Sequence, residues 1–244
     1  LINIHFPIDF NHLEIAKKKI IFEEFFFNQL RFNLVKINRK RINPGYYFPS
    51  ISNKFKTFYD SKLNFDLTNS QKKVLKEIRE DFSSKKQMNR LLQGDVGSGK
   101  TIVAIMSVII AVENNFQSCI VAPTEILAQQ HFSSFTNYLS DININVKILT
   151  GSTTKLQRNL ILSDLIIGKI DVLIGTHALF EDDVRFKNLG YVVIDEQHKF
   201  GVKQRSKMWK KNNPPPHVLI MTATPIPRTL TMSIYGDLDI SIID

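Results

Sequence analysis

Residues 94–101 read Gly-Asp-Val-Gly-Ser-Gly-Lys-Thr and fit the pattern G-x-x-x-x-G-K-[ST] in full. A short apolar run precedes them at Leu91–Gln93, and a long apolar run follows at Ile102–Val112. A strand, a glycine-rich loop and a helix in this order form a phosphate-binding loop (P-loop), because backbone N–H groups and the helix dipole surround phosphate oxygens. A chance match in a glycine-rich turn is the alternative. We predict nucleotide contacts from Gly94, Asp95, Val96, Gly97, Ser98, Gly99, Lys100 and Thr101.

A second motif extends this prediction to catalysis. Lys100 is expected to reach the β- and γ-phosphates of ATP, and the Thr101 hydroxyl is expected to hold Mg²⁺. Residues 192–198 read Val-Val-Ile-Asp-Glu-Gln-His, so an apolar strand delivers Asp195 and Glu196 to its carboxyl end. The first carboxylate suits Mg²⁺, and the second suits the orientation and deprotonation of a water. Adjacent acids at a strand end are often a solvated turn, and their pairing with the P-loop is what favours catalysis.

Short apolar runs alternate with helical stretches from Leu63 onward. Such runs are expected of strands that are covered on both faces, and their alternation with helices indicates parallel connections. The sequence therefore predicts an α/β fold with a doubly wound, mainly parallel sheet, whose ligands bind at the carboxyl ends of the strands. The predicted strands are Leu91–Gln93, Ser118–Ala122, Val146–Thr150, Val172–Gly175, Tyr191–Ile194 and Val218–Met221.

The first part of the chain has a different character. A helix is predicted over Leu13–Leu30, with Asn11 as its cap. The three consecutive phenylalanines at 25–27 are too many to leave in water, so this helix is expected to pack on another element. Residues 33–61 are basic, aromatic and poorly periodic, which is typical of a connecting arm. The predicted parts are a helix and arm over residues 1–62 and an ATP-binding domain over residues 63–244.

The composition narrows the class of protein. Apolar residues make up 43% and charged residues 23% of the chain, a balance that excludes a disordered protein. The longest apolar run is too short to span a bilayer, so no membrane partner is expected. Cys119 is the single cysteine, which excludes an intrachain disulfide and a cysteine-based zinc site. We expect a buried, inert Cys119 and, since no export signal is visible, a cytoplasmic location.

The net charge of +9 favours a polyanionic partner such as nucleic acid. Residues 1–62 hold eleven Lys and Arg against five Asp and Glu. A general bias of the chain toward Lys, Asn, Ile and Phe explains the same excess of positive charge, so the charge alone does not show that the chain binds nucleic acid. Within the arm, a solvated charge run is the alternative to DNA contact for Lys36, Arg39, Lys40 and Arg41.

The P-loop and the Asp195-Glu196-Gln197-His198 segment together resemble the motifs of helicase superfamily 2. Residues 63–71 resemble its Q motif, which implies that Phe65 stacks near the adenine and that Gln71 hydrogen-bonds to it. A helix start capped by Thr68 explains the same residues and is compatible with that role. The catalytic residues that the resemblance implies are Lys100, Asp195, Glu196 and His198.

Three further segments, at residues 122–130, 151–152 and 175–177, resemble the DNA-contact motifs of the superfamily. Each places small or hydroxyl-bearing residues at a strand end or helix start, which suits backbone phosphates rather than bases. Capping or turn chemistry is the alternative for each position, and His177 fits either interpretation. The expected DNA contacts are Pro123, Thr124, Gly151 and Thr176.

Residues 222–225, Thr-Ala-Thr-Pro, resemble motif III of the superfamily. The resemblance implies a hydroxyl relay through Thr222 and Thr224 that joins His198, near the γ-phosphate, to the DNA surface.

Longer segments resemble the RecG family of DNA helicases, namely residues 5–7, 13–30, 94–101, 174–179, 195–205 and 221–230. The motor of the transcription-repair coupling factor shares some of these segments. It usually reads Asp-Glu-Glu-Gln where this chain has Asp195-Glu196-Gln197-His198, and its P-loop differs at Ser98, so the motifs favour RecG.

The RecG resemblance implies a RecA-like domain that hydrolyses ATP with Mg²⁺ to remodel branched DNA at stalled forks and recombination junctions. It also implies a wedge domain before Leu1 and a second RecA-like domain after Asp244, so residues 1–244 alone are expected to bind nucleotide but to show little ATPase activity. Two alternatives stay open: another superfamily 2 translocase on RNA or duplex DNA, and a nucleotide-gated nucleic-acid-binding module without turnover.

Overall fold

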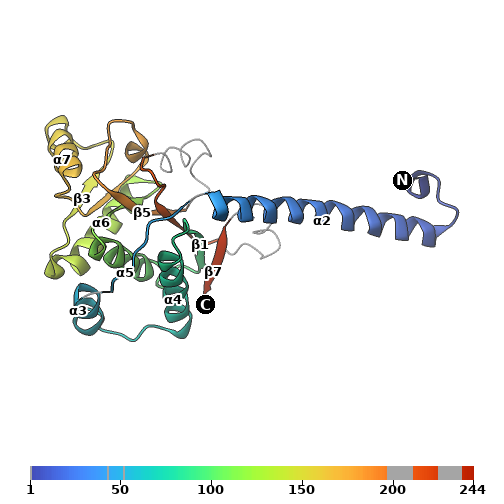
Figure 1. The fold of residues 1–244 in the computed structure, drawn as a ribbon, viewed down its shortest axis with the longest axis horizontal. Helices are drawn as coiled ribbons and strands as arrows, with labels where there is room; N and C mark the ends of the chain where they lie inside the picture. Colours follow the sequence, from blue (N-terminus) through green and yellow to red (C-terminus); the bar gives the residue numbers. More distant parts are fainter. Residues whose placement is uncertain (1, 43, 52, 197–210, 225–237) are drawn as a thin grey trace. The chain divides into compact units, whose positions relative to one another are not determined.

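The computed structural model describes residues 2–42, 44–51, 53–196, 211–224 and 238–244. The chain divides into two compact units. The first consists of residues 1–42 with 226–238, and the second of residues 43–225 with 239–244. Figure 1 shows the helices of the first unit and the sheet of the second.

The described part of the first unit contains α1 (Ile2–His5) and the long helix α2 (Phe10–Ile42). The cap predicted at Asn11 is wrong: Asp9 precedes the helix, and its carboxylate accepts the His12 backbone N–H at 2.8 Å. This hydrogen bond lowers the pKa of Asp9, as expected of an acid at a helix start.

The three phenylalanines of α2 are at least half exposed within the described residues: Phe25, Phe26 and Phe27 expose 62%, 50% and 62% of their surface. Phe26 stacks on Phe22 and meets Phe27 edge-on, both within the same helix. The packing on another element that the sequence predicts therefore stays a prediction. The side chains of Lys36, Arg39, Lys40 and Arg41 lie outside the described part of the structure.

The second unit is built on a sheet that has seven strands in its described residues. All six predicted strands are present, with ends shifted by at most a few residues, and a strand that the sequence analysis missed completes one edge. The strands are β1 (Asn89–Gly94), β2 (Gln117–Val121), β3 (Val146–Leu149), β4 (Val172–Gly175), β5 (Leu189–Asp195), β6 (His217–Thr222) and β7 (Asp239–Ile243).

The strand order is β3-β4-β2-β5-β6-β1-β7, and every pairing is parallel. The chain moves across the sheet in one direction from β1 to β3 and in the other from β3 to β7. Because right-handed crossovers put a helix on the face set by this direction, α5 (Lys100–Glu113) and α6 (Glu125–Leu139) cover one face and α7 (Lys155–Ile167) the other. The doubly wound α/β fold predicted from the sequence is confirmed.

Helix α5 is the centre of the core. All ten residues from Ile102 to Ala111 are buried, and the helix packs against β1, β2 and β5. Each buried aliphatic side chain there stabilises the fold by about 1.5–3 kcal/mol. Cys119 on β2 is also fully buried, which confirms its predicted position, and burial raises the pKa of its thiol to about 12. No helix among the described residues is both long and apolar enough to cross a membrane.

Residues 43–62, assigned to the connecting arm from the sequence, belong to the α/β unit. Phe48 and Phe58 are buried in its core, and α3 (Asn53–Ser61) packs on α5. Phe48 lies against Phe82 of α4 (Asn69–Ser83). It belongs to a stretch without helix or strand, so no periodic pattern in the sequence marks it as buried. The compact units of the structure therefore divide at residue 42, and the domain boundary expected at residue 62 stays a prediction.

His217, at the start of β6, fastens this segment to the sheet. The backbone N–H of Met88 donates to His217 Nδ1 at 2.9 Å, so the ring proton lies on Nε2, which donates to the Tyr46 carbonyl at 2.8 Å. Both ring nitrogens of a fully buried imidazole are thus satisfied in its neutral form. Burial lowers the pKa of His217 to about 4.

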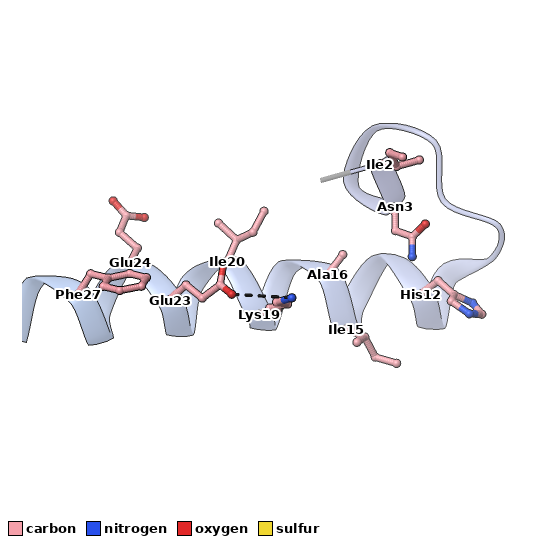
Figure 2. Close-up of a pocket in the computed structure, with 10 residues that line it drawn as sticks. All are labelled: Ile2, Asn3, His12, Ile15, Ala16, Lys19, Ile20, Glu23, Glu24 and Phe27. Atoms are coloured by element: carbon pink, nitrogen blue, oxygen red, sulfur yellow. Dashed lines mark ion pairs between the residues drawn. The ribbon is translucent and has the colours of Figure 1, made fainter.

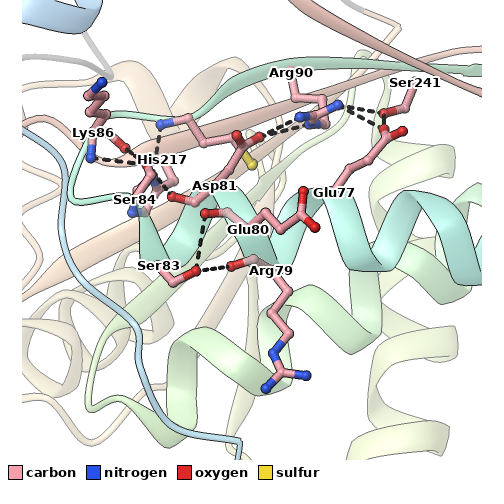
Figure 3. A network of polar contacts seen from close by, with 11 residues as sticks. Glu77, Arg79, Glu80, Asp81, Ser83, Ser84, Lys86, Arg90, His217 and Ser241 are labelled. Carbon is pink, nitrogen blue, oxygen red and sulfur yellow. Dashed lines mark hydrogen bonds and ion pairs between the residues drawn. The ribbon is translucent and has the colours of Figure 1, made fainter.

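A partly buried cluster of polar side chains joins α4 to the sheet (Figure 3). Arg90 on β1 donates to Glu77 Oε2 at 3.0 Å and to Asp81 Oδ2 at 2.8 Å, both on α4. Its Nη1 also donates to Ser241 Oγ on β7 at 2.8 Å. The Arg90 side chain is only 10% exposed, so its charge depends on these partners. The cluster holds the strand that leads into the P-loop against the helix that carries the Q motif.

The neutral state of His217 predicts a loss of stability in acid. The unfolded chain takes up a proton near pH 6.5 and the folded chain only near pH 4, so the free energy of unfolding falls as pH drops between these values. This single group is expected to remove about 3 kcal/mol between pH 7.5 and pH 4. Urea unfolding at several pH values measures it, with His217→Gln as the reference. An equally steep acid loss in both proteins would contradict the assignment.

Candidate nucleotide-binding site

The P-loop connects the end of β1 to the start of α5, as the sequence predicts. Gly97 and Gly99 have φ angles of +85° and +87°, a region that side chains other than glycine rarely adopt. Gly99 occupies the cap position of α5, so no side chain caps this helix start. The first N–H groups of the helix are therefore placed to receive an anion. Val96 at the tip of the loop is 90% exposed.

Lys100 lies inside the loop. Its Nζ donates to the carbonyl oxygens of Gly94 at 2.7 Å and Asp95 at 2.8 Å. Burial lowers the pKa of Lys100, and the negative charges of Asp195, Glu196 and Asp95 oppose this shift. The lysine, the two adjacent acids and the loop thus form one electrostatic site, which is the convergence that the sequence predicts.

The Q-motif residues lie beside the P-loop. Thr68 and Gln71 form a reciprocal cap at the start of α4, which confirms the cap predicted at Thr68. The other end of the Gln71 amide, Nε2, donates to the Ser98 carbonyl at 2.9 Å. Both ends of this amide therefore bind protein, and adenine recognition by Gln71 stays a prediction. Phe65 is 49% exposed, which leaves its ring face accessible for the predicted stacking.

The two acids lie at the carboxyl end of β5. Asp195 is the last residue of the strand, and Glu196 follows with a φ of +51°. The Glu196 backbone N–H donates to the Met221 carbonyl at 2.9 Å, and its Oε1 accepts the Ala223 N–H at 3.0 Å. The neighbouring β6 thus fixes both the backbone and the carboxylate of Glu196. His198, the fourth predicted catalytic residue, lies outside the described residues.

The residues of the predicted relay form a local turn at the end of β6. The hydroxyls of Thr222 and Thr224 lie 2.8 Å apart, and the Thr224 N–H donates to Thr222 Oγ1 at 3.2 Å. The hydrogen bond from the Ala223 N–H to Glu196 connects this turn to the acids. The sequence did not predict this hydrogen bond, because a backbone N–H is present at almost every residue and leaves no pattern of side chains.

The predicted DNA contacts lie at the ends of β2, β3 and β4. Thr124 is exposed and caps α6, with its hydroxyl accepting the Leu127 N–H at 3.3 Å, and Pro123 beside it is partly exposed. Gly151 is exposed in the turn after β3. Thr176, in contrast, is only 2% exposed, and its hydroxyl has no hydrogen-bond partner among the described residues. Direct contact of DNA with the Thr176 side chain therefore stays a prediction that this arrangement does not favour.

Glu125 joins two of these segments. Its carboxylate accepts the backbone N–H of Ser152 at 3.2 Å and the Ser152 hydroxyl at 2.9 Å. The start of α6 and the turn at Gly151 are therefore held side by side at one end of the sheet.

His131 on α6 is a further residue of the site that the sequence analysis missed. Its Nε2 lies 2.8 Å from Asp195 Oδ2, and the two side chains are 10% and 13% exposed. A carboxylate only accepts hydrogen bonds, so the imidazole donates. The spacing of His131 could have indicated this contact. His131 shares the buried face of α6 with Ala128, Phe135 and Leu139, and a polar side chain on a buried face requires a hydrogen-bond partner.

The donors at this site fit a magnesium–nucleotide complex. Mg²⁺ at phosphate sites is held by one or two protein oxygens, the substrate phosphates and waters rather than by an all-protein cage. Among the described residues, no group of three or more His, Cys, Asp and Glu side chains gathers as a metal cage. A threonine hydroxyl at the start of α5 and a carboxylate at the end of β5 match this requirement through Thr101 and Asp195.

The first unit has a groove between α1 and α2 (Figure 2). It is lined by residues of the two helices, among them Ile2, Ile20 and Phe27, and carries the exposed ion pair between Lys19 and Glu23 at 3.8 Å. It contains no predicted site residue.

The comparisons with known proteins agree with this geometry. Residues 68–233 match the model of the DEAD/DEAH box helicase family. The RecG ATP-dependent DNA helicase of Aquifex aeolicus is 50% identical over 95% of this chain, and that of Thermotoga maritima is 48% identical over 99%. The chain spans only 29% and 30% of the length of these two relatives.

A solved structure, described as RecG bound to a three-way DNA junction, superimposes with a TM-score of 0.84 at 43% identity. The match covers 99% of this chain and 32% of that one.

The two left-handed glycines allow a matched test of the P-loop. Gly97→Ala and Gly99→Ala share the same backbone strain, but a Cβ at Gly97 meets no atom within 4 Å, whereas one at Gly99 comes within 2.4 Å of Gln71 Nε2. Gly99→Ala is therefore expected to cost more stability than Gly97→Ala, and Gln71→Ala should remove most of the difference. Urea unfolding of the single and double variants measures this coupling, expected above about 0.5 kcal/mol. Equal costs for the two glycines would contradict the contact.

Proposed function

The chain belongs to the DEAD/DEAH box helicase family, and from this premise we propose that it is the ATP-binding part of a motor that acts on branched duplex DNA. The whole protein's activity is part of the proposal, because the matched relatives are about three times as long as this chain. The wedge and second RecA-like domains that the RecG resemblance implies belong to the same proposal.

The observation that supports this function best is the order of the strand ends. Strands β5, β6 and β1 are neighbours, so the acids at 195–196, the turn at 222–224 and the P-loop share one stretch of the carboxyl edge. The charges of Asp195 and Glu196 act on Lys100 across this stretch. A P-loop faced by two carboxylates binds a metal–nucleoside triphosphate and positions a water for its hydrolysis.

Each residue has a separate proposed role. The P-loop N–H groups and Lys100 bind the phosphates, which requires Lys100 to leave the carbonyls of Gly94 and Asp95. Thr101 and Asp195 hold Mg²⁺, which supplies charge neutralisation at the phosphates. Glu196 orients and deprotonates the attacking water. Because Ala223 donates to Glu196, the position of the base depends on the turn after β6.

The DNA surface is proposed for the other half of the edge, where β2, β4 and β3 end. Thr124 and Gly151 are exposed there, and Glu125 keeps their segments together. Hydroxyl and N–H groups of this kind bind backbone phosphates, so binding is expected to depend on salt and little on base sequence. Branched DNA is proposed as the substrate because the relative of known structure is described as bound to a three-way junction.

Lys100→Ala is expected to abolish nucleotide binding or weaken it at least about a hundredfold, since two charge-assisted contacts to phosphate are lost. Fluorescence titration with a labelled ATP analogue measures this. Lys147→Ala on β3 is a matched control that removes a lysine elsewhere and should bind as wild type. Unchanged affinity of a folded Lys100→Ala protein would exclude the P-loop as the nucleotide site.

Glu196→Gln is expected to leave nucleotide binding intact while steady-state hydrolysis falls by several orders of magnitude, because the base is lost and the phosphate cradle remains. The measurement is DNA-stimulated phosphate release by the intact protein. Near-normal turnover would show that another group is the base. Absence of turnover in wild type, with nucleotide-dependent DNA binding retained, would instead favour a gated binding module without hydrolysis.

A further inference from the structure

His131 connects the two halves of the carboxyl edge. It lies on α6, the helix that Thr124 caps after β2, and it reaches Asp195 at the end of β5, the strand that pairs with β2. The strands on one side of this contact end in the segments of the proposed DNA surface, and those on the other side end in the nucleotide site. The hydrogen bond therefore crosses the boundary between them.

The contact has the character of a built polar pair rather than a surface ion pair. His131 is 8% exposed, and its ring packs edge-on near Phe135 of the same helix, with centroids 6.4 Å apart. An apolar residue would fill this place on the buried face of α6 without the cost of desolvating an imidazole. The imidazole also restricts the orientation of the Asp195 carboxylate through the hydrogen bond to Oδ2, which leaves acceptor positions on both oxygens for the metal or its waters.

We infer that His131 is a positioning residue that orients Asp195 for Mg²⁺ and ties the metal site to the position of α6. Groups that hold a metal-binding side chain by a hydrogen bond raise metal affinity by restricting that side chain to its binding orientation. Since α6 begins at a proposed DNA contact, a shift of this helix on DNA would reach Asp195 through one side chain. The inference rests on the proposed function, because it requires Asp195 to serve a metal–nucleotide complex.

The test compares two amides at one position. In His131→Gln the side-chain NH₂ lies close to the place of Nε2 and can still donate to Asp195. In His131→Asn the amide is one methylene shorter and falls out of reach. Leu139→Val, on the same buried face two turns along, controls for loosened packing of α6. The readout is binding of a fluorescent non-hydrolysable ATP analogue to the protein as Mg²⁺ is titrated, with binding in EDTA as the metal-free reference.

His131→Asn is expected to raise the Mg²⁺ concentration at half-maximal binding by about tenfold to a hundredfold. His131→Gln and Leu139→Val should stay within a few-fold of wild type, and metal-free binding should change in none of them. Equal Mg²⁺ midpoints for the Asn and Gln variants would overturn the inference, whether both matched wild type or both were weakened. Failure of the proposed function looks different: wild type itself would bind the analogue without any dependence on Mg²⁺.

The proposed coupling between the metal site and the DNA surface through α6 is tested by a separate measurement. In wild type, the Mg²⁺–nucleotide complex is expected to change the affinity for a forked duplex, and His131→Asn should reduce that change at saturating Mg²⁺, whereas His131→Gln should preserve it. A change in DNA affinity that is as large in the Asn variant as in wild type would show that α6 reports the nucleotide state by another route.

Discussion

The seven described strands run in one direction, and this constraint gathers the chemistry of the chain at a single edge of the sheet. Parallel pairing requires every connection to cross back over a face, so each strand end opens into a loop followed by a helix start or an exposed turn. The motifs at Lys100, Thr124, Asp195 and Thr222 are far apart in sequence and become neighbours only because of this rule. The order of the strands then separates the proposed nucleotide contacts from the proposed DNA contacts.

Buried polar side chains fix the parts of the unit whose apolar packing alone would leave them free to slide. His217 holds the segment at Tyr46, Arg90 holds α4 against β1, and His131 holds α6 against β5. In each case a buried side chain forms a hydrogen bond with another part of the fold in a low-dielectric interior, where an unmade hydrogen bond costs about 1–3 kcal/mol. Such contacts therefore specify how the elements pack more than they add stability, and one of the three, at His131, reaches a residue of the proposed nucleotide site.

The sequence is sufficient for features that depend on neighbouring residues. The six predicted strands, the buried α5, the P-loop and the acids after β5 all come from local apolar runs and their endings. The features that the sequence did not predict depend on contacts between residues that are far apart in the chain. Strand β7 is a short run that is defined by pairing with β1, about 150 residues earlier. Residues 43–62 bury Phe48 from a stretch without helix or strand, which has no period to detect, and Phe58 from the short helix α3. The partners of Glu196 and His131 are known only once the strand order is known.

We propose that the P-loop and the acids at the end of β5 form one site for a magnesium–nucleoside triphosphate. A crystal structure of the chain with Mg²⁺ and a non-hydrolysable ATP analogue tests it most directly. We expect phosphates at the start of α5, Lys100 Nζ moved from the carbonyls of Gly94 and Asp95 onto phosphate oxygen, and the metal between Thr101 and Asp195. Nucleotide bound elsewhere, with Lys100 still on those two carbonyls, would exclude this site.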